Sequence, residues 1–184
     1  FNLLGLKNNT NHTKKINLIY KVNTVLDEDE IKSEGNIKLK YNKQKDFVYS
    51  KNLYTSSIEN ISYIYSSEKT SSYTGDSQSI NIFSNLDLNN ENSLGNKACM
   101  AIKIQVELGA FEEKEISFIL GACNNEKEIL TDYKEIKNCK NEYQNTKNYW
   151  SDLLGRVSVK TPVEELNIIL NGWAMYQTIS SRLY

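Results

Sequence analysis

Hydrophobic and polar residues alternate along most of the first 120 positions, which is the period of a half-buried β-strand. The alternation is clearest in five runs, at residues 16–22, 37–41, 61–66, 102–108 and 116–120. Clusters of Asn, Asp, Glu and Gly separate most of these runs and are typical of turns. Short strands with one wet face each predict an antiparallel β-sandwich. No alternation of strands with helices and no Gly-rich phosphate-binding motif occurs, so a Rossmann-type or P-loop fold is not expected.

A long polar stretch at residues 66–96 interrupts this pattern and contains one weak strand signal, at 80–83. Connections of this length inside a compact domain are usually functional or disordered. Within it, residues 72–76 (SYTGD) predict a tight turn that presents an aromatic ring and a carboxylate together. An ordinary loop explains the same residues.

From residue 125 the period becomes helical, with apolar residues recurring at threes, fours and sevens. The polar run at 138–144 leaves open whether this helix is unbroken. Gly155 is a natural helix stop, and residues 157–160 (VSVK) predict a short strand. We therefore divide the chain into a β-sandwich at 1–124, a helical linker at 125–160 and a final helix at 161–184.

The final segment carries a full set of helix-start signals. Thr161 is a predicted N-cap, Pro162 stands at the first helical position, and Glu164 completes a capping box. The apolar residues of 161–184 form two faces and leave only a narrow polar strip. Because a helix that is apolar on two sides packs among other helices, the segment predicts the first helix of a larger helical domain. A tail that packs on its own domain is the alternative.

Composition limits the kinds of binding and catalytic site that the chain can form. A net charge of −1 and a pI near 6.0 give no basic surface for nucleic acid or an anionic membrane. The three cysteines (Cys99, Cys123 and Cys139) form no CxxC pair, which predicts free thiols in a reducing, cytoplasmic compartment. The single His12 lies in a turn-like run, and the paired carboxylates lie in turns or first helical turns. The residues therefore predict no catalytic group, no metal site and no bound cofactor.

Three stretches match motifs of one enzyme family in the same order. They are SSYTGD at 71–76 against SYTGDR…FLGR, residues 94–121 against GLDPCAALQ…VELAPGEEKEVVFLLG, and residues 149–184 against WDDLLG…V.TP…LLNRWLLYQTLSCRLWAR. The chain thus resembles the glycan phosphorylases of glycoside hydrolase family ninety-four, and among them the phosphorylase-like part of cyclic β-1,2-glucan synthases.

This resemblance implies a galactose-mutarotase-like supersandwich, longer than the one here, then a helical linker and an (α/α)6 barrel. It implies inverting phosphorolysis of a β-glucoside, with inorganic phosphate as co-substrate and with the general acid on the barrel. It also implies that a β-glucan or glucose phosphate binds through that barrel, and that the sandwich shapes the site and a homodimer contact. The motif positions that match, and that we therefore take as candidate substrate-binding residues, are Tyr73, Asp76, Trp173, Gln177 and Arg182.

Two positions depart from the motifs: Ser77 and Gly172 each stand where the family has Arg, which leaves open whether the parent enzyme is active. The favoured hypothesis is a non-catalytic sandwich and linker of an enzyme that makes or phosphorolyses β-glucans. One alternative is a free-standing carbohydrate-binding sandwich that uses exposed tyrosines. Another is a structural module that self-associates through Trp173, Tyr176 and Leu183.

Overall fold

The computed structural model describes residues 1–24, 30–33, 35–54, 61–80, 87–95, 97–129 and 134–182. Its contacts divide the chain into two compact units, Phe1–Cys139 and Lys140–Tyr184. The boundaries that the sequence places after residues 124 and 160 stay predictions. In chain order the elements are β1 (Asn2–Lys7), β2 (Lys14–Val22), α1 (Glu30–Ser33), β3 (Ile37–Asn42), β4 (Phe47–Asn52), β5 (Ile61–Ser66), β6 (Thr70–Asp76), η1 (Ser77–Ser79), β7 (Ser93–Leu94), β8 (Ala98–Leu108), β9 (Glu113–Cys123), η2 (Glu126–Glu128), α2 (Ile136–Gly155), α3 (Glu164–Ile168), η4 (Ile169–Trp173) and α4 (Ala174–Ser180).

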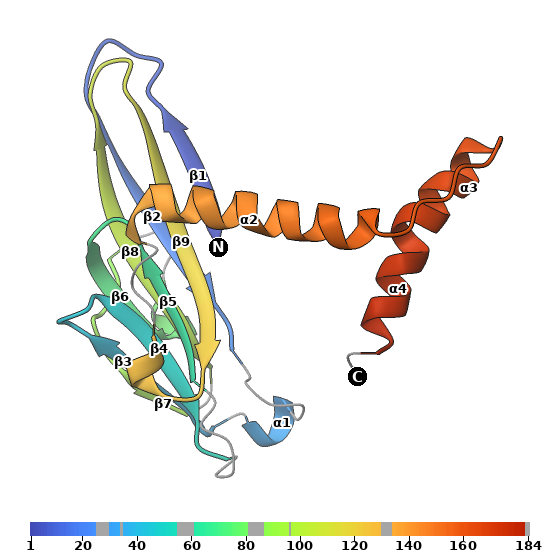
Figure 1. The fold of residues 1–184 in the computed structure, drawn as a ribbon. Coiled ribbons are helices and arrows are strands. Elements are labelled where there is room, and N and C mark those ends of the chain that lie inside the picture. The colour runs from blue at the N-terminus through green and yellow to red at the C-terminus, as the bar shows by residue number, and fades with distance from the viewer. Residues whose placement is uncertain are drawn as a thin grey trace. The chain divides into compact units, whose positions relative to one another are not determined.

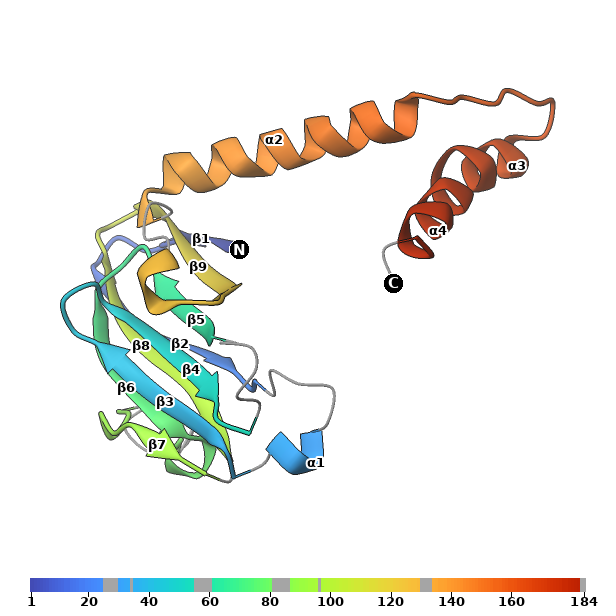
Figure 2. The same ribbon diagram turned by 60° about the horizontal axis from the view of Figure 1, so that its bottom comes forward.

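The first unit is a sandwich of two antiparallel sheets (Figure 1). One sheet has the strand order β1-β9-β5-β4-β3-β7, and the other has the order β2-β8-β6. Figure 2 shows the two layers from a second direction. The mainly β, antiparallel sandwich followed by helices confirms the predicted fold class.

The main core lies between the two sheets. It contains Leu39, Val48, Ile64, Met100, Ile102, Ile104, Val106, Leu108, Ile116 and Phe118, all nearly or fully buried. The ring of Tyr20 on β2 stacks on Phe118 of β9, with centroids 4.8 Å apart, and so joins the two sheets. Because each buried aliphatic side chain contributes roughly 1.5–3 kcal/mol, this cluster is the main source of the unit's stability.

A second apolar layer covers the outer face of the six-stranded sheet. Its members are Phe47, Ile61, Tyr63, Tyr65, Ile119, Ile129 and Cys139. As a result β5 is buried on both faces, and the prediction that the run at 61–66 has one wet face is wrong. Ser62 instead points between the sheets, where its hydroxyl lies 2.8 Å from that of Ser50. Paired hydroxyls satisfy each other, which lets small polar residues sit in this interior.

The polar stretch at 66–96 contains a full strand, β6, so the prediction of a tight turn at residues 72–76 is wrong. β6 pairs with β8 and carries an irregularity between Thr74 and Asp76. The Gly75 amide leaves the ladder there and donates to the Glu91 carbonyl at 3.0 Å. Short-range turn chemistry was therefore outweighed by pairing with β8. Most of the weak strand signal at 80–83 lies outside the described residues.

In the second unit, α2 runs unbroken through the polar run at 138–144 and ends at Gly155, as predicted. The predicted strand at 157–160 does not form. The backbone of Val159 pairs instead with one side chain. Val159 N donates to Asn171 Oδ1 at 2.7 Å, and Asn171 Nδ2 donates to the Val159 carbonyl at 2.8 Å. The side-chain amide of Asn171 thus makes the two hydrogen bonds that a neighbouring strand would otherwise make to Val159.

The predicted capping box is also absent. α3 begins at Glu164 after Val163, which makes no side-chain cap. The Thr161 hydroxyl accepts from the Val163 amide at 3.2 Å and lies 2.9 Å from Asn167 Oδ1, so it serves the preceding turn. The helix continues to Ser180 through a π-helical stretch at Ile169–Trp173. Much of its apolar surface is exposed, with Trp173 at 63%. That a helical barrel covers this apolar surface stays a prediction.

We expect Asn171→Ala to speed hydrogen exchange at the Val159 amide by roughly fivefold, because it removes hydrogen bonds that contribute about 1 kcal/mol. Hydrogen-exchange mass spectrometry of residues 156–162 measures this change. Asn145→Ala, on the exposed surface of α2, is the matched control. Unchanged exchange at Val159 would contradict the role assigned to Asn171.

Candidate functional site

A pocket of about 520 Å³ opens where the β3–β4 hairpin meets the start of β6. Its lining is polar and aromatic and consists of Tyr41, Lys43, Asp46, Lys69, Thr70, Ser71, Tyr73 and Asn90. Small-molecule sites generally fall between about 300 and 1,000 Å³ and combine aromatic walls with a few placed polar groups. Size and lining therefore make this pocket the candidate site.

Two tyrosines form its wall. Tyr41 comes from β3 of the six-stranded sheet and Tyr73 from β6 of the three-stranded sheet, and their rings stack with centroids 4.3 Å apart. The Tyr73 amide donates to Asn90 Oδ1 at 3.0 Å, which fixes the connection beside the ring. The wall therefore spans both layers of the sandwich.

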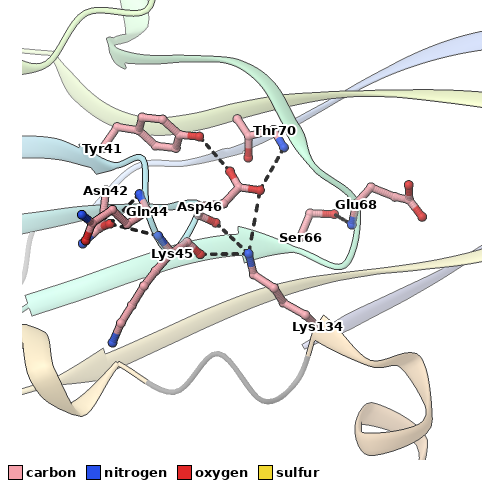
Figure 3. Close-up of polar contacts among 9 residues, drawn as sticks. All are labelled: Tyr41, Asn42, Gln44, Lys45, Asp46, Ser66, Glu68, Thr70 and Lys134. Atoms are coloured by element: carbon pink, nitrogen blue, oxygen red, sulfur yellow. Dashed lines mark hydrogen bonds and ion pairs between the residues drawn. The ribbon is translucent and has the colours of Figure 1, made fainter.

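Asp46 holds the base of the pocket together (Figure 3). Asn42 first sets the hairpin turn, since its Oδ1 accepts from the amides of Gln44 and Lys45, each at 3.1 Å. That turn places Asp46 at φ 55°, a conformation that Asp tolerates better than most residues. The Asp46 carboxylate then accepts from the Tyr41 hydroxyl at 2.8 Å and from the Thr70 amide at 3.2 Å.

Lys134 closes the same cluster from the segment that follows the sandwich strands. Its Nζ donates to the Lys45 carbonyl at 2.9 Å and lies 3.8 Å from Asp46 Oδ2 (Figure 3). The ammonium also lies 5.9 Å from the centroid of the Tyr65 ring, within range of a cation–π contact. The Asp46 side chain is only 18% exposed, so its charge is both paired and largely shielded from solvent.

Burial raises the pKa of Tyr41, and the hydrogen bond to Asp46 and that residue's negative charge raise it further. Burial also raises the pKa of Tyr49 to about 12, with help from its hydrogen bond to Glu126. For both tyrosines the folded pKa exceeds the unfolded value near 10. The native state therefore binds more protons above that pH, and stability falls as the pH rises from about 10 to about 12.

We expect Tyr41→Phe to lower the free energy of unfolding by about 1 kcal/mol at pH 7, because Asp46 loses its hydroxyl donor. The same change should make the loss of stability between pH 10 and 12 shallower than in the wild type. Urea unfolding at pH 7, 10 and 11 measures both effects. Tyr54→Phe, at an exposed tyrosine, is the control. An unaltered pH slope would show that the Tyr41 proton is not held by Asp46.

The structure separates the residues predicted from the motifs. Tyr73 lies in the pocket wall. Asp76 is not among the lining residues, and its carboxylate accepts from the Gln78 amide at 2.9 Å, which caps η1. Trp173, Gln177 and Arg182 belong to the second unit, on η4, α4 and the turn after α4. Their roles in substrate binding stay predictions.

Sequence reasoning missed Tyr41, Asp46, Asn90 and Lys134. Residues 42–46 showed only turn chemistry, and Tyr41 was counted as one apolar position of an alternating strand. The sequence did offer one signal, since an Asn and an Asp at the two ends of a five-residue turn segment, 42–46, can each accept hydrogen bonds from backbone amides. That pattern does not reveal Thr70 or Lys134 as the partners.

Comparison with known proteins gives the family. The family model described as "Glycosyl hydrolase 94, supersandwich domain" matches residues 1–139, the same residues that form the first unit. The chain belongs to the glycosyl hydrolase 94 supersandwich family. It is also similar to "Cyclic beta-(1,2)-glucan synthase NdvB" of Rhizobium meliloti (strain 1021), with 25% identity over 104 residues. That alignment covers 55% of this chain and 4% of the relative, so the chain spans a small fraction of it.

Three described carboxylates of this glycosyl hydrolase 94 supersandwich form ion pairs with lysines. Glu113 pairs with Lys7 at 2.5 Å, Glu68 with Lys114 at 2.9 Å, and Asp87 with the buried Lys103 at 2.5 Å. Cys99 is 1% exposed, and burial raises the pKa of its thiol to about 11, as for a small hydrophobic core residue.

Among the residues that the structure describes, the His, Cys, Asp and Glu side chains form no group of three that could hold a metal ion. Within the same residues, no helix has the length and apolar character that crossing a bilayer requires.

Proposed function

We propose that this supersandwich is a non-catalytic part of an enzyme that makes or phosphorolyses β-glucans. The reaction is inverting phosphorolysis, with inorganic phosphate as co-substrate and no further cofactor. The observation that carries the proposal is the family match, which covers the whole first unit. The name of the similar synthase supports β-glucan as the substrate class, and the pairing of Glu113, Glu68 and Asp87 with lysines supports a non-catalytic role.

The second unit supports contact with a helical partner domain. Large apolar side chains on α3, η4 and α4 are exposed, among them Ile168 at 69%, Trp173 at 63% and Tyr176 at 51%. Clusters of this kind mark interaction surfaces. In the proposed enzyme residues 161–184 form the first helix of the catalytic barrel, this surface packs against the other barrel helices, and the sandwich contributes to the subunit contact of a homodimer. The three free cysteines support a cytoplasmic location.

A free-standing carbohydrate-binding module is the second candidate. The observation that favours it is the pocket beside Tyr41 and Tyr73, which combines an aromatic wall with polar groups from three segments of the chain. Under this hypothesis the domain binds a glucan without a catalytic domain attached to it.

The complete gene and its product distinguish the two. We expect sequence for a helical barrel after residue 184, and a product that releases glucose 1-phosphate from a β-glucan only when inorganic phosphate is present. The chain of residues 1–184 alone, assayed in parallel, should release none. Release by the chain alone would disprove the non-catalytic role, and release of free glucose without phosphate would disprove phosphorolysis. A complete gene without a barrel would favour the carbohydrate-binding module.

A further inference from the structure

We infer that the pocket beside Tyr41 and Tyr73 binds a single pyranose unit, either of a neutral glucan chain or of a glucose phosphate. The choice of a sugar as ligand rests on the proposed function. The position of the site and the residues that form it rest on the geometry of the pocket alone. Neither the family match nor the named relative assigns a ligand to these residues.

The aromatic wall gives the first argument. A pyranose has an apolar face of C–H groups and a rim of hydroxyls, and it packs against an aromatic surface while its rim is hydrogen-bonded. Tyr41 and Tyr73 are each part-buried and their rings stack with centroids 4.3 Å apart, so each ring covers one face of the other and holds it in place. Because little side-chain freedom is left to lose, a ligand that packs there has a small entropic cost.

The balance of donors and acceptors gives the second argument. Among the described residues that line the pocket, the one carboxylate is that of Asp46, and it is engaged by Tyr41, Thr70 and Lys134. By contrast, no described carboxylate pairs with Lys43 or Lys69, and no described acceptor takes the Asn90 side-chain amide protons. The pocket therefore presents mostly donors, which match a ligand rich in oxygen acceptors. Sugar hydroxyls and phosphate esters both meet this condition.

The base of the pocket gives the third argument. Thr70 is 8% exposed, and its hydroxyl has no hydrogen-bond partner among the described residues. A buried hydroxyl without a partner is destabilising by about 1–3 kcal/mol. It lies beside the Asp46 carboxylate in Figure 3 and lines the same pocket, so a ligand hydroxyl or a bridging water at the base would satisfy it.

The test is isothermal titration of the full chain with two probes, a linear β-1,2-glucan oligosaccharide and glucose 1-phosphate. Tyr73→Leu keeps an apolar side chain against the core but removes the ring, and we expect it to weaken binding about tenfold, or roughly 1.4 kcal/mol. Tyr149→Leu is the matched control, because Tyr149 is 62% exposed on α2, outside the pocket. Equal weakening by both variants would overturn the site.

A second variant covers the case in which Tyr73→Leu does not fold. Lys43→Met combined with Lys69→Met changes two exposed side chains and should weaken binding of glucose 1-phosphate at least fivefold, and that of the neutral glucan less. Raising the salt concentration should weaken only the phosphate probe.

Each outcome bears on the inference. Binding of either probe with loss in the pocket variants supports it, and the ratio of the two affinities shows which source of the pyranose is preferred. Binding of neither probe, or binding that the pocket variants leave unchanged, overturns it. Failure here leaves the proposed function standing, because that proposal is tested by phosphate-dependent release of glucose 1-phosphate from the complete gene product.

Discussion

Replacing Asp87 with asparagine is expected to lower the free energy of unfolding by about 3 kcal/mol, whereas Lys103→Met should leave it within about 1 kcal/mol of the wild type. Lys103 lies in the middle of β8 and is 2% exposed, and its ammonium is 2.5 Å from Asp87 Oδ1. Asp87→Asn would leave a buried positive charge without its counter-charge. Lys103→Met removes that charge and fills the same volume with apolar atoms.

The magnitude follows from the exposure of the two partners. Loss of one member of a fully buried pair generally destabilises a protein by about 3–5 kcal/mol. Here the Asp87 side chain is 72% exposed, so water can reach the ammonium more easily once the carboxylate is lost. We therefore place the effect at the lower end of that range.

Urea unfolding at pH 7 of the two variants and of Asp152→Asn, an exposed acidic residue on α2, measures these differences. Asp152→Asn controls for the loss of one negative charge. The account is wrong if Asp87→Asn and Asp152→Asn unfold at the same urea concentration. It is also wrong if Lys103→Met is less stable than Asp87→Asn.

The same ion pair shows what the sequence could and could not predict. Alternation in β8 correctly placed Ile102 and Ile104 toward the core, because strand period is a local property. It also placed Lys103 on a wet face, which is wrong. The face is covered by Leu88 and Ile80, from the long polar connection, which pack on Cys99, Ala101 and Ile19. Burial of this face of β8 depends on contacts between distant segments, and the sequence of the connection has no periodic pattern that would predict it.

In the candidate site, too, only the residue carried by a local sequence motif could be predicted. Tyr73 could be predicted, because it belongs to a motif of consecutive residues. Its partners could not, since Tyr41 and Asp46 come from the β3–β4 hairpin and Asn90 from the connection after β6, and these segments meet Tyr73 only when both sheets are formed. The strands themselves were predictable one by one. The order β1-β9-β5-β4-β3-β7 was not, because every pairing in it except β4–β5 and β3–β4 joins segments that are not neighbours along the chain.

Gly75→Ala is the other substitution with a large expected effect, a loss of about 3 kcal/mol in the free energy of unfolding. A Cβ on Gly75 would lie 2.6 Å from Ser93 Oγ and 2.8 Å from the Ser93 backbone nitrogen. Since a backbone atom is among the clashing neighbours, rotation of one side chain cannot relieve the contact. Ser93 would have to move, which breaks the hydrogen bond from its Oγ to the Gly75 carbonyl at 2.6 Å.

Gly5→Ala, measured in parallel by urea unfolding, is the matched control, because a Cβ on Gly5 would meet no atom within 4 Å. It lies in β1 and should change stability by less than about 1 kcal/mol. If the two variants lost similar amounts of unfolding free energy, the loss at Gly75 could not be attributed to its close contact with Ser93.

The position of Gly75 explains why a stability defect there should reach the pocket as well. Ser93 belongs to β7, which pairs with β3 in the six-stranded sheet, while Gly75 belongs to β6 in the other sheet. Moving Ser93 away therefore shifts β3 relative to β6, the two strands that carry Tyr41 and Tyr73. We expect Gly75→Ala to weaken binding of the glucan oligosaccharide even at temperatures where the variant is fully folded, and Gly5→Ala to leave it unchanged. The glycine of the SYTGD sequence thus acts on the candidate site through the spacing of the two sheets.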